Sequence, residues 1–300
     1  MDGMVNVKPE QFARIWSALI TPTREDESVN YEALEQVVEL QIQDGVEGFY
    51  CCGSSGEGLL LTLEERKQVL EHVVKAADGR VPVISHVGTI RTRDVIDLAR
   101  HAMSAGAMAV SMIPPYYYKF SMDEIMGYYE DVIRALPDVP AIVYNIPQFT
   151  GVEFNKDNAG RLLANENIVG IKHTSTNLYG LERMGQAFPG KALINGFDEQ
   201  LLGAMAMGSC ATIGTTVNLF APLFHRVRDA FEKGDMAQAY RWQHAINQRV
   251  EETVKIGIFN AMKYGWTLRG VDCGFCRSPF RPLDEAARKA MAEVMALPLE

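Results

Sequence analysis

The 300-residue sequence predicts an α/β fold, namely a (β/α)8 TIM barrel with a C-terminal helical extension. Short apolar segments alternate with amphipathic helical segments along the chain, as expected for parallel strands joined by helices. This unit recurs eight times, and a barrel of this kind takes roughly 250 residues. A doubly wound open sheet is the alternative architecture. No loop carries the glycine-rich dinucleotide motif of many such sheets, which favours the barrel.

The predicted strands are apolar throughout, which is typical of strands buried on both faces of a parallel sheet. They cover residues 15–20, 48–52, 81–87, 108–113, 141–146, 169–174, 192–196 and 211–214. Between them, Asn30 is expected to cap one helix. Thr62 with Glu65, and Ser121 with Glu124, have the spacing of capping boxes that begin two others.

The alternation stops after the eighth unit. Residues 235–263 and 283–295 have helical spacing with no further strands. We therefore predict a barrel over residues 1–232, with its site at the C-terminal ends of the strands, and a helical extension over 233–300. The extension is expected to pack on the barrel or on a neighbouring subunit.

Composition limits the possible partners. Apolar residues make up 47% of the chain and charged residues 22%, which is enough for a full core. The formal net charge of −9 argues against nucleic acid and anionic membranes as partners, but not against a small anionic substrate. No long apolar window is present, and Met1–Gly3 does not begin a signal segment, so we expect neither membrane insertion nor secretion.

The five cysteines are an odd number, and Cys51, Cys52 and Cys210 fall in apolar runs. This favours a reducing, cytoplasmic location over a disulfide framework. Cys273 and Cys276 have the C-x-x-C spacing. A zinc site would need two further ligands nearby, and a redox pair would be expected near the start of a helix, so we expect neither role.

Lys172 ends the apolar strand at 169–174, where an apolar residue would be expected. Burial disfavours the charged ammonium and leaves a neutral amine, which can attack a carbonyl and form a Schiff base. The alternative is a lysine that only forms a salt bridge at the strand end. Side chains alternate along a strand, so Thr174 shares the face of Lys172, while His173 points away and is expected to be structural.

Other candidates also fall at the C-terminal ends of strands, where barrels carry their active sites. Tyr144 ends the strand next to that of Lys172 and could relay protons, or it could be a core aromatic. Ser54 and Ser55, with nearby backbone N–H groups, could hold a carboxylate, or form only a turn. Asp198 and Glu199 could bind substrate, or complement a helix dipole.

Three motifs resemble those of the pyruvate-dependent class I aldolases of the dihydrodipicolinate synthase family. They are Gly53-Ser54-Ser55-Gly56-Glu57, Tyr144-Asn145-Ile146-Pro147 and Gly170-Ile171-Lys172, and the resemblance covers essentially the whole chain. It implies that Lys172 is the Schiff-base lysine and Tyr144 the proton shuttle. It also implies that Ser54 and Ser55 hold the pyruvate carboxylate.

Two branches of the family differ near the site. In the synthase branch an arginine grips a second carboxylate, and Phe149 stands at that place here. The lyase branch has K-x-T-S-x-x-L-Y, matched from Lys172 to Tyr179, and N-G-[YF]-D-E, matched from Asn195 to Glu199. Ser55 departs from this branch, which usually has threonine there. The resemblance implies that the polyol end of a sugar acid is bound by Thr174, Gly196, Asp198, Glu199 and Thr215.

The resemblance therefore implies reversible cleavage of N-acetylneuraminate to N-acetylmannosamine and pyruvate, with no metal or organic cofactor. It also implies that Tyr117, after the fourth strand, reaches the site of a neighbouring subunit in a homotetramer. Two alternatives stay open. One is a pyruvate aldolase or dehydratase acting on a shorter sugar acid, and the other is a non-catalytic barrel that binds sugar acids.

Overall fold

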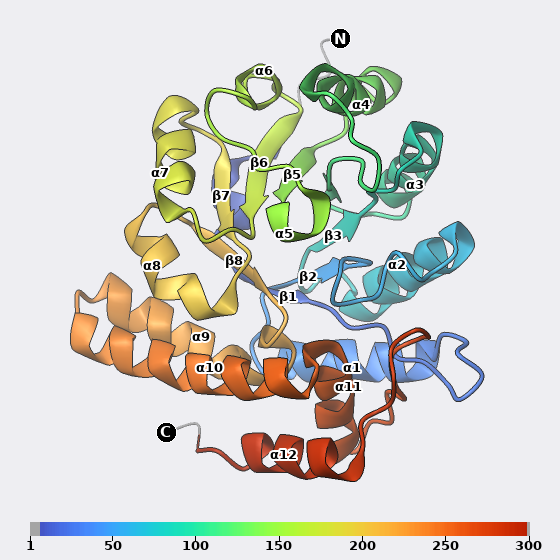
Figure 1. Cartoon of the computed structure of the whole chain (residues 1–300), viewed down its shortest axis with the longest axis vertical. Coiled ribbons are helices and arrows are strands. Elements are labelled where there is room, and N and C mark those ends of the chain that lie inside the picture. The colour runs from blue at the N-terminus through green and yellow to red at the C-terminus, as the bar shows by residue number, and fades with distance from the viewer. Residues whose placement is uncertain (1–6, 299–300) are drawn as a thin grey trace.

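The computed structural model describes residues 7–298, and within them eight parallel strands close into a barrel in sequence order (Figure 1). The strands are β1 (Ile15–Ala18), β2 (Gly48–Cys51), β3 (Val83–His86), β4 (Ala109–Met112), β5 (Ala141–Asn145), β6 (Ile168–His173), β7 (Ala192–Asn195) and β8 (Ala211–Gly214). The predicted (β/α)8 barrel is confirmed, and every predicted strand is present with slightly different ends.

Helices surround the barrel, as Figure 1 shows. They are α1 (Tyr31–Gln43), α2 (Leu63–Ala77), α3 (Thr92–Ser104), α4 (Met122–Ala135), α6 (Gly160–Leu163), α7 (Leu178–Ala187), α8 (Leu201–Ala206) and α9 (Val217–Glu232). Three short elements, η1 (Pro9–Phe12), α5 (Pro147–Thr150) and η2 (Asp198–Gln200), were not predicted. The Asn30 side chain caps α1, and both predicted capping boxes form.

The strands are buried along their whole length, because one face meets the helices and the other meets the barrel interior. The interior cluster includes Trp16, Ile142, Ile194 and Ile213, together with Phe12 from η1. Trp16 donates its indole N–H to the Phe12 carbonyl at 2.9 Å. The interior is therefore packed with side chains, and polar chemistry is confined to its mouth.

The C-terminal extension packs on this chain's own barrel. It consists of α10 (Met236–Ile256), α11 (Ile258–Leu268) and α12 (Glu285–Met295), and α10 runs alongside α9 (Figure 1). Residues 235–263 are helical, as predicted, but they belong to two helices, because Gly257 adopts φ +101° between α10 and α11. Glycine takes this conformation at little steric cost, and the chain turns there.

Among residues 7–298, no helix is both long and apolar enough to cross a membrane. The tripeptide Met1–Gly3, considered above for a signal segment, lies outside the described residues. Cys51, Cys52, Cys273 and Cys276 are buried free thiols, whereas Cys210 is exposed. Burial raises the pKa of both Cys273 and Cys276, which makes their thiols less reactive.

Candidate active site

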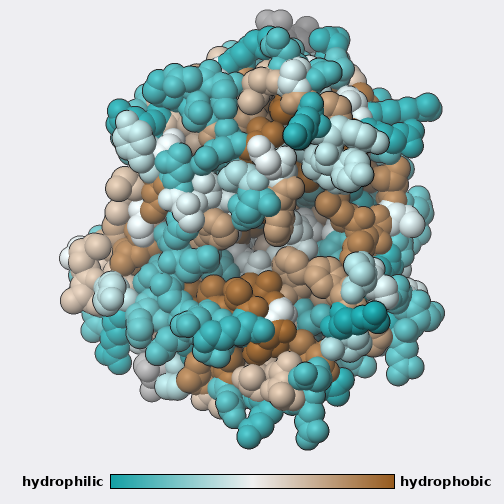
Figure 2. Space-filling view, in the orientation of Figure 1, coloured by the Kyte–Doolittle hydropathy of each residue, from teal (hydrophilic) through white to brown (hydrophobic). Residues whose placement is uncertain are grey.

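A cavity of about 190 Å³ opens at the C-terminal ends of the strands. Figure 2 shows this face of the molecule hollowed near its centre. Every predicted site residue except Tyr117 lines the cavity: Ser54, Ser55, Tyr144, Lys172, Thr174, Gly196, Asp198, Glu199 and Thr215. These residues come from the ends of β2, β5, β6, β7 and β8 and from the loops that follow. The barrel therefore brings together side chains that are far apart in sequence.

Lys172 lies on β6 with only 4% of its surface exposed. Burial lowers the pKa of its ammonium to about 7, although the negative charge of Asp198 opposes the shift. The ion pairs found among the described residues do not include Lys172. A large fraction of this amine is thus neutral and nucleophilic near neutral pH.

Two tyrosine rings enclose the Lys172 amine. Nζ lies 4.1 Å from the centroid of the Tyr144 ring and 4.2 Å from that of Tyr50. The faces of both rings attract a cation, so they stabilise positive charge at this nitrogen when a reaction creates it. Tyr50 was missed from the sequence, because in a short apolar strand it looks like any core aromatic. Its hydroxyl lies 3.1 Å from Ser111 Oγ, away from the predicted chemistry.

Tyr144 is on β5, where its Cα is the register partner of Lys172 on β6. The side chain is buried, and burial raises the pKa of its phenol to about 12. The hydroxyls of Thr174 and Ser54 lie close enough to lower it, but by less than burial raises it. At neutral pH the phenol therefore holds its proton and can donate it to a substrate oxygen.

Ser54 and Ser55 lie in a tight turn after β2. The Glu57 N–H donates to the Ser54 carbonyl at 3.1 Å, and the Gly58 N–H to the Gly53 carbonyl at 3.0 Å. A Cβ at residue 58 would lie 1.9 Å from the Cys52 carbonyl oxygen, so only glycine fits there. Ser55 Oγ lies 2.7 Å from Thr215 Oγ1, which links the turn to the loop after β8.

Asp198 and Glu199 differ in their surroundings. Asp198 Oδ2 accepts hydrogen bonds from the backbone N–H and the hydroxyl of Thr216, both at 2.7 Å. Burial raises the pKa of Asp198 to about 6. Its other oxygen is buried and has no hydrogen-bond partner among residues 7–298. The Glu199 side chain is exposed at the rim, and partial desolvation raises the pKa of this carboxyl.

Gly196 and Thr174 are in close contact. A Cβ at residue 196 would lie 1.8 Å from Thr174 Oγ1, so a larger residue would displace this hydroxyl from the cavity. Thr174 Oγ1 is itself buried, with no hydrogen bond of standard geometry among the described residues. Buried hydroxyls normally have partners, so this oxygen is ready to bind a polar group in the cavity.

His173 is structural, as the alternation along the strand predicts. Its Nδ1 lies 3.0 Å from Asn145 Nδ2, and its Nε2 lies 3.0 Å from the Asn177 carbonyl oxygen. Tyr117 does not join the site of its own chain. Its side chain is 86% exposed, and its backbone adopts φ +75°, which is uncommon for a residue other than glycine.

One wall of the cavity comes from the C-terminal extension and was not predicted. Val250 and Val254 of α10 line it, together with Ile258 and Phe259 at the start of α11. Phe149 of α5 and Phe197 add further apolar surface. Helical spacing identifies an apolar face but not the surface that it covers, so the sequence contained no signal for this wall.

A buried lysine of lowered pKa beside a tyrosine, at the mouth of a (β/α)8 barrel, is the arrangement of a carbon–carbon lyase of the class I aldolase type. The chain belongs to the dihydrodipicolinate synthetase family, whose model matches residues 11–297. It is 42% identical over 285 residues to the N-acetylneuraminate lyase of Rhizobium meliloti (strain 1021), covering 94% of each chain.

Solved structures agree with this assignment. The N-acetylneuraminate lyase of Fusobacterium nucleatum superposes with a TM-score of 0.90 at 33% identity, over 95% of this chain and 98% of that one. The Clostridium difficile protein CdNal, in complex with mannosamine, superposes with a TM-score of 0.91 at 30% identity, over 94% of this chain and 97% of that one.

Proposed function

We propose that this enzyme cleaves N-acetylneuraminate reversibly to N-acetylmannosamine and pyruvate. The observation that carries the proposal is the buried Lys172, with a pKa of about 7, facing the protonated Tyr144 in a cavity lined with hydroxyls and carboxylates. The similarity to lyases of this name supports the same substrate.

The reaction begins at the Lys172 amine. Its lone pair attacks the keto carbon of the open-chain sugar acid, and a proton moves from nitrogen to oxygen to give a carbinolamine. The Tyr144 phenol then donates its proton to the departing hydroxyl, which leaves as water. The products of this step are an iminium cation on Lys172 and a phenolate on Tyr144. The ring faces of Tyr50 and Tyr144 stabilise the cation.

The iminium cation accepts electrons, and this allows the carbon–carbon bond to break. The phenolate takes the proton of the hydroxyl on the carbon that becomes the aldehyde, and the carbon–carbon bond breaks. Its electron pair moves to the iminium nitrogen, so an enamine forms and N-acetylmannosamine is released. Tyr144 then protonates the enamine carbon. Water returns a proton to Tyr144 and releases pyruvate and the free amine.

The two ends of the substrate bind to different groups. Ser54, Ser55 and backbone N–H groups of their turn hold the carboxylate, which hydrogen-bond donors favour. The polyol end is bound by Thr174, Gly196, Asp198, Glu199 and Thr215, whose oxygens accept hydrogen bonds from hydroxyls. Phe149, where the synthase branch has arginine, lines the cavity with an uncharged ring and disfavours binding of a second carboxylate. The scheme uses no metal or organic cofactor.

Tyr117 supports a homo-oligomer. An 86% exposed tyrosine in a strained backbone conformation is costly unless a partner holds it. We assign Tyr117 to the site of a neighbouring subunit. This requires at least a dimer, and we propose a homotetramer.

The free buried thiols favour a cytoplasmic location. We also propose that residues 1–232 form the barrel and residues 233–300 the helical extension, and the end of α9 at Glu232 supports this division.

Borohydride reduction in the presence of pyruvate tests the mechanism. We expect a covalent adduct that peptide mapping places on Lys172, and none in Lys172→Met. An adduct elsewhere, or no adduct, would overturn the Schiff-base assignment.

A panel of sugar acids, assayed for pyruvate release, tests which substrate the enzyme prefers. Faster turnover of a shorter sugar acid than of N-acetylneuraminate would favour the alternative aldolase, and no turnover of any would favour a binding protein.

A further inference from the structure

A buried ion pair joins the C-terminal extension to the serine turn. Lys263 Nζ of α11 lies 2.6 Å from Glu57 Oε1, and the side chains are 0% and 2% exposed. Neither residue lines the cavity. Two charges are costly to bury, and such a pair persists only when further hydrogen bonds satisfy it. Lys263 Nζ also donates to the Phe275 carbonyl at 2.9 Å and to Thr23 Oγ1 at 3.2 Å.

The Glu57 backbone needs this support. It adopts φ +53°, a conformation that costs free energy for a residue with a side chain. Its carboxylate is held a second time, because the backbone N–H of Arg277 donates to Oε2 at 2.7 Å. One residue earlier, Thr21 Oγ1 donates to the Gly56 carbonyl at 2.8 Å. The turn that presents Ser54 and Ser55 is therefore fixed from outside the cavity.

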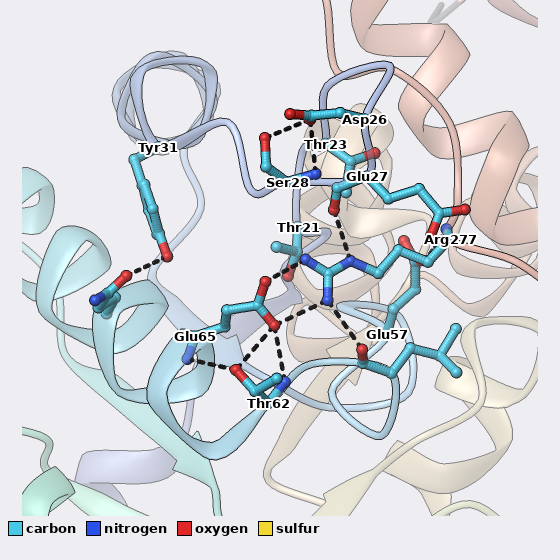
Figure 3. Close-up of polar contacts among 12 residues, drawn as sticks. Thr21, Thr23, Asp26, Glu27, Ser28, Tyr31, Glu57, Thr62, Glu65 and Arg277 are labelled. Carbon is cyan, nitrogen blue, oxygen red and sulfur yellow. Dashed lines mark hydrogen bonds and ion pairs between the residues drawn. The ribbon is translucent and has the colours of Figure 1, made fainter.

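Arg277 holds the chain that follows this turn, and its guanidinium points at the Glu65 carboxylate at the start of α2 (Figure 3). It also donates to the Leu60 carbonyl at 2.9 Å. Arg277 holds the pKa of Glu65 down at about 2, so this contact stays charged at any ordinary pH. Residues more than 200 positions away in sequence thus hold the chain just after the two serines, at Glu57, Leu60 and Glu65.

We propose that Lys263 is a positioning residue for carboxylate binding. Through Glu57 it sets the position of Ser54 and Ser55, while the first turn of its own helix places Ile258 and Phe259 in the cavity wall. An apolar pair in place of Lys263 and Glu57 could give comparable stability, but would not fix the orientation of Glu57. This inference rests on the proposed function, in which the serine turn holds the pyruvate carboxylate.

The test compares Lys263→Met, Glu57→Gln and the double variant. Each single variant leaves a buried group without its partner, so we expect a lower Tm and a pyruvate KM raised by about tenfold or more. The double variant leaves no unpaired charge, so it recovers part of the Tm that each single variant loses, although the Phe275 carbonyl and Thr23 still lack the lysine donor. Its pyruvate KM stays raised. The KM for N-acetylmannosamine, in the condensation direction, should change by less than about twofold, because that substrate binds at the other end of the cavity.

Lys255→Met is the matched control. This lysine also forms ion pairs in the extension, but with exposed partners on α10, and we expect neither Tm nor KM to change. If the double variant regains the parent's pyruvate KM together with its Tm, Lys263 is only structural and the proposal fails. Equal changes in both KM values would also overturn it. A different result would overturn the proposed function, namely that the unsubstituted protein forms no borohydride adduct with pyruvate on Lys172.

Discussion

Tyr144 and Lys172 are register partners on adjacent strands, with the lysine Nζ 4.1 Å from the centroid of the tyrosine ring. Burial moves their pKa values apart, that of the amine down to about 7 and that of the phenol up to about 12. In water the two groups titrate close together. In this barrel a neutral amine and a protonated phenol coexist at neutral pH, which is the state from which imine formation starts.

The Tyr144 hydroxyl is the first point to test. Tyr144→Phe keeps the ring beside Lys172 but removes the proton that the scheme uses, so we expect kcat to fall by about 10²- to 10⁴-fold. Tyr50→Phe is the matched comparison, since its ring also faces Lys172 while its hydroxyl is turned to Ser111. It should lose far less activity. Similar losses in both variants would contradict the assignment of Tyr144 as the proton shuttle.

The pH dependence of imine formation should report the Lys172 amine. Only the neutral amine attacks, so the rate of borohydride trapping at low pyruvate should rise with pH through about 7 and then level off. The Tyr144 phenol, with its pKa of about 12, should not limit this rate below pH 10. A rise centred near 10 would mean that the amine keeps its ordinary pKa and that burial does not activate it.

Lys172 should also cost stability, in a pH-dependent way. Its pKa is about 10.5 in the unfolded chain and about 7 in the folded one, so folding disfavours the charged form. The stability lost by burying Lys172 is greatest below pH 7, decreases as the pH rises from 7 to 10.5, and is zero above pH 10.5. Lys172→Met should therefore stabilise the protein more at pH 6 than at pH 9, by about 2–3 kcal/mol in the free energy of unfolding.

Urea unfolding of both proteins at the two pH values measures this difference. Lys172→Met changes the free energy of unfolding through both packing and charge. Packing differences between lysine and methionine do not depend on pH, so the difference between the changes at pH 6 and pH 9 comes from ionisation of the Lys172 amine. If Lys172→Met raised the free energy of unfolding equally at pH 6 and pH 9, the Lys172 charge would be solvated in the folded state.

Asp198 and Glu199 should respond differently to removal. Asp198→Ala leaves the buried Thr216 N–H and hydroxyl without their acceptor, at a cost of about 1–3 kcal/mol for each group. We expect a lower Tm as well as weaker binding of N-acetylneuraminate. Glu199→Ala changes an exposed side chain, so Tm should hold while the KM for N-acetylneuraminate rises. Thermal melts and KM values for both substrates measure this. An equal rise in the pyruvate KM would contradict polyol binding.

The sequence was sufficient to predict the barrel and the pairing of Lys172 with Tyr144. Apolar runs and their turn residues are local signals, and strand order in a barrel follows from sequence order. The break at Gly257 was missed, because one glycine within helical spacing is compatible with a continuing helix. The wall formed by Ile258 and Phe259, and the contact between Lys263 and Glu57, depend on tertiary packing that no short pattern encodes.

The extension has a consequence for synthesis. All eight strands have been translated by Gly214, yet the cavity wall and the support of the serine turn come from residues 250–277. A nascent chain could thus assemble its sheet well before its pocket. Lys263 and Arg277 support the serine turn only once the late helices have docked. We therefore expect translation products that end before residue 250 to contain Lys172 but to bind pyruvate poorly.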